Sequence, residues 1–172
     1  DVSMAFILGQ TLNETTQTSI FSESDLYGDI IQGSFLDSYD NLTLKTLSIL
    51  DWTTKYCPKS RFLLKTDDDV FTNMPNLLSL IEEHWNANRT MFGYVVKNWG
   101  PNRDETSKYY LPFEQYSGSV FPDFIPGTAY LVRMDCLQEI YMECLKQRFV
   151  RLEDILVTGI VPEVLNISRV DV

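Results

Sequence analysis

The chain has 172 residues, of which 44% are hydrophobic and 22% are charged. This length and composition suffice for one folded domain with a core, and they exclude a disordered chain. The net charge is −10 and there are no clusters of Lys or Arg. The chain therefore lacks the positive patch with which a protein binds nucleic acid or an anionic membrane surface. A ligand that carries phosphate would therefore need a divalent cation to neutralise it.

Strand and helix patterns alternate along the chain. Short apolar runs predict buried strands at residues 5–8, 29–32, 61–64, 91–96 and 129–132. Helical periodicity predicts helices at 41–56, 75–85, 137–145 and from about Glu153 onward, with Asp40 as the N-cap of the first. Between them, residues 98–124 are rich in aromatic residues, Pro and Gly and indicate a long functional loop. This alternation favours one α/β domain over residues 1–172, built on a largely parallel sheet.

The two ends of the chain and its glycosylation sequons bear on its compartment. Neither the start at Asp1 nor the end at Val172 resembles a native terminus or a closing element, so we expect a fragment that is incomplete at both ends. No apolar run approaches the roughly 20 residues that span a bilayer. N-glycosylation sequons begin at Asn13, Asn41, Asn88 and Asn166. They favour a lumenal protein.

The sharpest chemical feature is an acidic triplet, Asp67, Asp68 and Asp69, at the end of an apolar strand. Adjacent carboxylates repel one another unless a cation lies among them. Open α/β sheets bind ligands at the carboxyl ends of their strands, and carboxylate oxygens suit Mg²⁺ or Mn²⁺ shared with substrate phosphates. The alternative interpretation is a solvated acidic turn without a role.

Other acidic motifs fit this triplet poorly. A calcium-binding EF-hand loop that began at Asp67 would require Gly and Glu where Thr72 and Leu78 stand. A phosphatase signature would require Thr or Val at the position of Phe71. A metal-dependent phosphotransferase would require a Gly-rich phosphate loop or a nucleophile, neither of which the sequence contains.

A second acidic pair, Glu153 and Asp154, precedes the apolar run of residues 155–159. Carboxylates at the start of a helix are stabilised by its dipole, which is the structural explanation for the pair. The functional interpretation is a general base that takes a proton from a sugar hydroxyl. The pattern alone leaves both open.

Four motifs occur in order and resemble one family. They are residues 27–32 (YGDIIQ), 35–46 (FLDSYDNLTLKT), 62–71 (FLLKTDDDVF) and 153–159 (EDILVTG). Together they closely resemble the β-1,3-galactosyltransferase and β-1,3-N-acetylglucosaminyltransferase family, relatives of Fringe. The resemblance spans nearly the whole chain.

The resemblance implies a GT-A type fold that binds nucleotide-diphosphate sugars, an inverting reaction and a type II membrane protein of the Golgi with a lumenal catalytic domain. By motif position, Asp69 and Asp67 would bind Mn²⁺ or Mg²⁺, and Asp154 would be the catalytic base. Lys65, Asp67, Asp68 and the turn at Gly127 would line the pocket of the UDP-sugar donor.

The sequence also departs from this family. Relatives use a His downstream of the acidic pair as a metal ligand, whereas no His follows Asp154 here, and we interpret His84 as structural. We expect a metal-dependent hexosyltransferase that moves galactose or an N-acetylhexosamine from a UDP-sugar to the 3-hydroxyl of a glycan on protein or lipid. The alternative is a catalytically silent relative that acts as a binding or chaperone-like partner.

Overall fold

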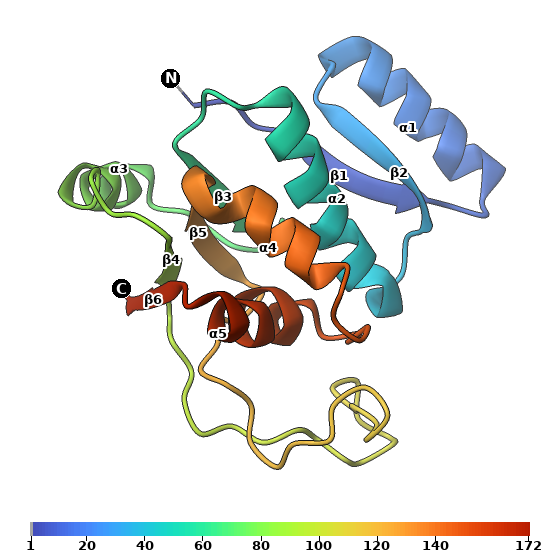
Figure 1. Cartoon of the computed structure of the whole chain (residues 1–172). Coiled ribbons are helices and arrows are strands. Elements are labelled where there is room, and N and C mark those ends of the chain that lie inside the picture. The colour runs from blue at the N-terminus through green and yellow to red at the C-terminus, as the bar shows by residue number, and fades with distance from the viewer. Residues whose placement is uncertain (1) are drawn as a thin grey trace.

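The computed structural model describes residues 2–172, which form two β-sheets and a set of helices (Figure 1). The strands are β1 (Phe6–Gln10), β2 (Ile30–Leu36), β3 (Phe62–Thr66), β4 (Thr90–Gly93), β5 (Ala129–Arg133) and β6 (Ser168–Asp171). The α-helices are α1 (Glu14–Tyr27), α2 (Leu42–Tyr56), α3 (Met74–Glu83), α4 (Leu137–Cys144) and α5 (Val161–Leu165). Short 3₁₀ segments lie at Tyr39–Asn41 and Met134–Cys136, and a π-helical stretch lies at Ile155–Ile160.

The larger sheet has four strands in the order β3-β5-β4-β6. β5 runs antiparallel to both β3 and β4, whereas β4 and β6 run parallel. The expectation of a largely parallel sheet is therefore wrong for this sheet, although β1 and β2 do pair in parallel. The physical reason is that a long segment without a crossover helix joins β4 to β5, so β5 can return in the opposite direction.

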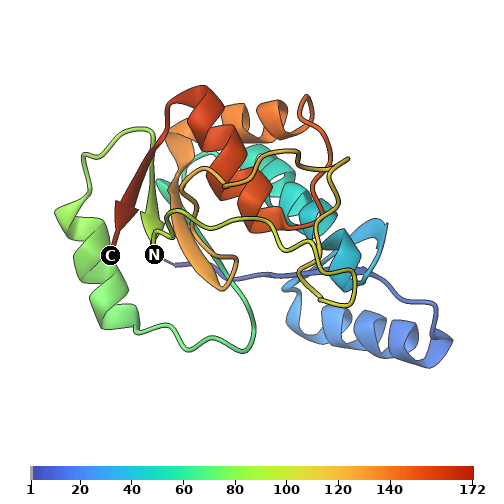
Figure 2. The same cartoon turned by 90° about the horizontal axis from the view of Figure 1, so that it is seen from below.

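Helices lie on both sides of the four-stranded sheet. α2, α4 and α5 pack side by side, and Figure 2 shows the sheet between this layer and α3. α2 and α4 were predicted from their apolar periodicity, and α3 from Pro75, which stands at its N-terminal turn. No helix within residues 2–172 is long and apolar enough to cross a membrane.

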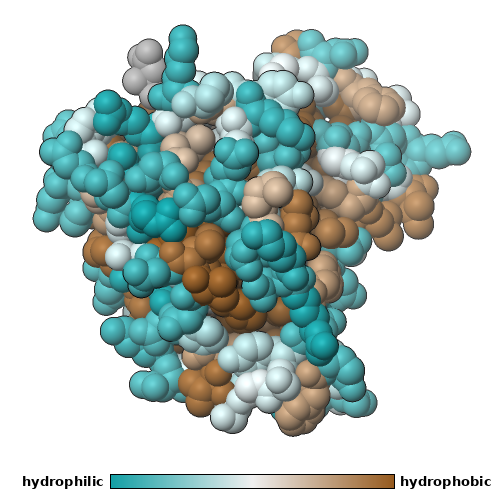
Figure 3. Space-filling view, viewed as in Figure 1, coloured by the Kyte–Doolittle hydropathy of each residue, from teal (hydrophilic) through white to brown (hydrophobic). Residues whose placement is uncertain are grey.

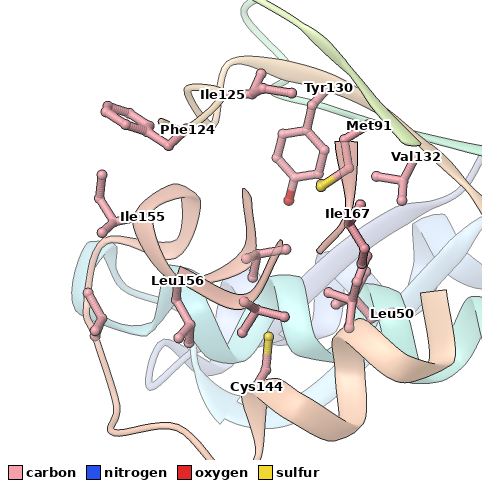
Figure 4. Packing of buried hydrophobic residues seen from close by; sticks show 14 of the residues in the cluster. Leu50, Met91, Phe124, Ile125, Tyr130, Val132, Cys144, Ile155, Leu156 and Ile167 are labelled. Atoms are coloured by element: carbon pink, nitrogen blue, oxygen red, sulfur yellow. The ribbon is translucent and has the colours of Figure 1, made fainter. Parts of the chain in front are cut away.

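The hydrophobic core lies between the four-stranded sheet and the helix layer. Its cluster draws on α2, β4, β5, α4 and the π-helical stretch, with Leu50, Met91, Val132, Ile140 and Leu156 among its members. Figure 4 shows the ring of Tyr130 inside this cluster beside Met91 and Ile125. Tyr130 is only 1% exposed, so its hydroxyl must find a partner inside the protein.

The N-terminal part contributes little to this core. α1 has no buried residue, and the core cluster of the described chain contains no side chain from β1, α1 or β2. α1 was missed by the sequence analysis because its apolar residues, such as Phe21 and Leu26, do not form a buried stripe and remain exposed. Figure 3 shows hydrophobic side chains over this end of the molecule as well as across its centre.

The predicted loop between β4 and β5 is confirmed as a long irregular segment. A bridge between Val96 and Phe124 closes its base. Inside it, the Arg103 guanidinium donates to the carbonyl oxygens of Leu111, Tyr116 and Gly118. A single cation thus organises a segment that has almost no strand or helix of its own.

One further expectation about local structure is wrong, and one strand was not predicted. Asp40 does not cap α2 but pairs with Arg151, at 2.6 Å between Oδ1 and Nη2. Residues 168–171, which carry no apolar alternation, form the edge strand β6 beside β4. A four-residue strand with Ser, Arg and Asp is held by its backbone pairing, and such pairing leaves no signature in composition.

A buried hydroxyl joins the segment before β5 to the helical segment that follows residue 153. Thr158 is fully buried, and its Oγ1 accepts a hydrogen bond from the N–H of Ile125 at 2.8 Å. The same oxygen lies 2.7 Å from the carbonyl oxygens of Ile125 and Asp154, either of which its proton can reach.

Replacing Thr158 with Val should leave the N–H of Ile125 buried without its partner. We expect Thr158→Val to lower the free energy of unfolding by about 1–3 kcal/mol. Thr18→Val on exposed α1 removes a hydroxyl that donates to Glu14 O, and it should change stability by less than about 0.5 kcal/mol. Urea denaturation of both variants is the measurement, and equal losses would contradict this account of Thr158.

Candidate active site

The acidic triplet lies where the sequence predicted, directly after β3. The antiparallel pairing of β3 with β5 continues past the strands, because the N–H of Asp67 donates to Thr128 O at 3.0 Å. Asp67 is half-buried, whereas Asp68 and Asp69 are exposed. The strand pairing therefore places the triplet beside the turn that contains Gly127.

Asp67 pairs with a lysine two residues earlier in β3. The distance from Lys65 Nζ to Asp67 Oδ1 is 2.6 Å. Within residues 2–172, no group of three or more His, Cys, Asp or Glu side chains is placed to hold a metal ion. Convergence of Asp67 and Asp69 on one cation accordingly stays a prediction, one that requires further oxygen ligands from a substrate.

Lys65 is largely buried and is surrounded by oxygens. Besides Asp67, its Nζ donates to the carbonyl oxygen of Gly127 and lies 3.3 Å from Glu153 Oε1. Burial pulls the pKa of Lys65 down, but the Glu153 charge and the Asp67 hydrogen bond outweigh it, so the pKa is raised. Lys65 is therefore a fixed cation at neutral pH.

Glu153 is a buried acid that the sequence analysis noted beside Asp154 without giving it a role of its own. It is 5% exposed, and its Oε2 accepts a hydrogen bond from the Tyr130 hydroxyl at 3.2 Å. Its other oxygen, Oε1, is buried without a hydrogen bond and faces Lys65 only as an ion pair. Burial raises the pKa of Glu153 to about 7, against the opposing effect of the Lys65 charge.

Asp154, the predicted base, is oriented by two backbone groups. Its Oδ2 accepts from the N–H of Gly127 at 3.2 Å, and its Oδ1 accepts from the N–H of Ile155 at 2.9 Å. Burial raises the pKa of Asp154, although these two hydrogen bonds act against the shift. The π-helical stretch begins at the next residue, and such irregular turns are frequent at functional sites.

The structure thus brings together most, but not all, of the residues that the sequence singled out. One network of hydrogen bonds contains four of them, namely Lys65, Asp67, Gly127 and Asp154. Asp68 and Asp69 lie beside it in the exposed turn. Glu153 and Tyr130 also belong to the network. Glu153 was noted only as part of the acidic pair and received no role of its own, and Tyr130 was missed. The one available signal was that Glu153 stands at the edge of an apolar run, where a carboxylate is expensive unless it has partners.

His84 lies away from this network. It follows the last residue of α3, and its ring centroid is 4.8 Å from that of Phe92. This packing agrees with the structural interpretation of His84.

Comparison with known proteins identifies the family. The family model described as galactosyltransferase matches residues 1–172. The chain belongs to the galactosyltransferase family. It is 39% identical over 158 residues to Beta-1,3-galactosyltransferase 1 of Mus musculus and to that of Homo sapiens, an alignment that covers 91% of this chain and 48% of each relative.

A second kind of relative is named for a different activity. The chain is 38% identical over 135 residues to Lactosylceramide 1,3-N-acetyl-beta-D-glucosaminyltransferase of Mus musculus. This alignment covers 77% of this chain and 36% of that relative. Both kinds of relative are glycosyltransferases that differ in the sugar named. This galactosyltransferase-family chain spans about half the length of the curated relatives it matches.

The raised pKa of Glu153 predicts a specific pH dependence of stability. Between its ordinary value of 4.5 and about 7, the folded state holds a proton on Glu153 that the unfolded state has lost. Raising the pH through this window therefore lowers the free energy of unfolding, by on the order of 1–3 kcal/mol, and the effect levels off above the folded-state pKa.

Glu153→Gln should lack this contribution. Urea denaturation of both proteins at about pH 5 and about pH 8 would measure it, with the larger loss expected in the wild type. Asp154, whose pKa is also raised, contributes with the same sign in both proteins, so Glu153→Gln should still lose some stability over this range. Equal losses in the two proteins would contradict the assignment to Glu153.

Proposed function

We propose that this chain is part of an inverting hexosyltransferase that moves galactose or an N-acetylhexosamine from a UDP-sugar to the 3-hydroxyl of a glycan. The observation that carries the proposal is that the turn at Gly127 joins the two acidic segments. Its N–H contacts Asp154, while its carbonyl contacts the lysine that pairs with Asp67. The activities named for the relatives support 1,3-glycosyl transfer.

Asp154 is the residue best suited to act as the base. Both of its oxygens are held by backbone N–H groups, which fixes the direction of the remaining lone pairs. Its raised pKa strengthens it as a proton acceptor, because a general base works best when its pKa approaches the working pH. The deprotonated 3-hydroxyl then attacks the anomeric carbon from the face opposite to UDP, and no covalent enzyme intermediate is required.

The donor would lie beside Lys65, Asp67, Asp68 and Gly127. Lys65 alone is a poor partner for a diphosphate, since Asp67 and Glu153 already surround its charge. The exposed carboxylate of Asp69, together with Asp67, offers the hard oxygen ligands that Mn²⁺ or Mg²⁺ prefers. These two carboxylates therefore suit such an ion. When bound, the ion would offset the charge that develops on the departing UDP.

The compartment proposed for this enzyme is the lumen of the Golgi, with a type II membrane anchor. Three of the sequon asparagines, Asn13, Asn88 and Asn166, are exposed and would be accessible to modification. The acceptor would be a glycan on a glycoprotein or glycolipid. Acceptors of both kinds reach enzymes on the lumenal side of the secretory pathway.

Asp154→Asn tests the base. The amide keeps the size of the side chain but cannot take a proton, so kcat should fall by about 10²–10⁴-fold while the affinity for UDP changes little. Transfer assays on the full-length protein with UDP-galactose, UDP-N-acetylglucosamine and UDP-N-acetylgalactosamine provide the measurement. A parallel loss of UDP affinity would instead assign Asp154 to the donor site, and a wild type that binds UDP without transfer would favour the catalytically silent alternative.

Asp69→Ala tests the metal. Because Asp69 is exposed, its removal should leave the fold intact and abolish both transfer and Mn²⁺-dependent binding of UDP. Asp25→Ala, a change at another exposed aspartate, on α1, is the matched control and should leave both unchanged. Calorimetric titration of UDP with and without Mn²⁺ measures binding directly. Wild-type activity that survives EDTA would overturn the metal assignment.

A further inference from the structure

A closed ring of contacts joins four residues of the site, namely Lys65, Gly127, Asp154 and Glu153. The Lys65 ammonium contacts Glu153 and the Gly127 carbonyl, and the Gly127 N–H contacts Asp154. Because Glu153 and Asp154 are adjacent in the chain, their backbone closes the ring. Gly127 is thus held through both of its peptide groups, by a cation on one side and by the predicted base on the other.

Gly127 itself has a steric reason to be a glycine. A Cβ atom at this position would collide with Glu153 Oε1 and would lie 3.6 Å from Lys65 Nζ. The absent side chain is what allows the Glu153 carboxylate to approach the turn and the ammonium together. The ring therefore depends on a Glu at 153 and on the lack of any side chain at 127.

Burial of Glu153 is not explained by stability. One of its oxygens has no hydrogen bond, and a buried acid with a raised pKa lowers the stability of the fold near neutral pH. An amide side chain of similar size would fill the same space and could still accept the hydrogen bond from Tyr130, without a charge to desolvate. Glu153 lowers the stability of the fold, yet it contacts the lysine that binds the turn beside the candidate base. This combination indicates a role in the reaction rather than in folding.

We propose that Glu153 is a positioning residue, which acts through Lys65 to fix the peptide groups of Gly127 and thereby holds the Asp154 carboxylate in one orientation. The Glu153 carboxylate itself contacts Lys65 and Tyr130. Tyr130 holds the far oxygen of Glu153 from inside the core, so the ring is anchored to β5. This inference rests on the proposed glycosyl transfer, in which the orientation of Asp154 matters.

The same ring reaches the donor side of the site. Lys65 also binds Asp67, one of the two proposed metal ligands. A shift of Lys65 would therefore disturb Asp67 as well as Gly127. Through the Lys65 ammonium group, the buried Glu153 can therefore influence both the proposed metal ligand Asp67 and the proposed base Asp154.

Two variants perturb the ring in complementary ways. Glu153→Gln keeps the shape and the hydrogen bond from Tyr130 but removes the charge that faces Lys65. Gly127→Ala keeps every charge but forces the carboxylate away from the turn. Glu139→Gln, which removes an exposed partner of Arg89, is the matched control for the Glu-to-Gln change.

Steady-state kinetics of the full-length protein separate positioning from binding. In both ring variants kcat should fall by about 10–100-fold, the usual effect of losing a group that orients a catalytic ligand. The KM for the acceptor should stay within about twofold, and the thermal midpoint of Glu153→Gln should not fall. Glu139→Gln should match the wild type. A Glu153→Gln enzyme with wild-type kcat overturns the proposal.

Deuterium exchange of peptides that contain Gly127 gives a readout that needs no activity. Its amide should exchange faster in both ring variants and at the wild-type rate in Glu139→Gln. Unchanged exchange in Glu153→Gln overturns the proposal even if kcat falls, because Glu153 would then act by another route. If the wild type transfers none of the three UDP-sugars, the proposed function fails, while the exchange rates still decide whether Glu153 fixes Gly127.

Discussion

The two hydrogen-bonded peptide groups of Gly127 hold the candidate site together. Its carbonyl meets the Lys65 ammonium and its N–H meets the Asp154 carboxylate, so the turn has a positive neighbour on one side and a negative one on the other. β3 and the helical segment that begins at Glu153 are both fixed to this residue, in addition to the direct ion pair between Lys65 and Glu153. The site is therefore as rigid as this turn.

The mixed sheet is what makes such a turn possible. β5 lies between β3 and β4 and runs antiparallel to both, so the start of β5 lies beside the end of β3. The turn before β5 thus meets the acidic triplet after β3, and Asp67 continues the strand pairing to Thr128. If β3 and β5 ran parallel, the start of β5 would lie beside the start of β3, a full strand length away from the end of β3.

Local pattern predicted the elements that bury an apolar face, and chemistry predicted most of the site. The strand before Asp67 and the helical start at Glu153 were both placed correctly, because apolar runs and carboxylates are visible residue by residue. α1 and β6 were missed, since neither carries an apolar stripe that burial would require. The direction of β5 and the burial of Glu153 depend on contacts between segments far apart in the chain, and single-sequence periodicity contains no such information.

The separation of β1, α1 and β2 from the core has a consequence for how the molecule opens. A two-stranded sheet is marginally stable by itself, and this one is covered mainly by α2 on one side and by a helix without buried residues on the other. Sub-global unfolding should therefore release residues 6–36 as a cooperative unit while β3, β5 and the site remain folded. The region most exposed to proteases would then be spatially distinct from the region that carries the chemistry, so limited cleavage there could leave the carboxylate network intact.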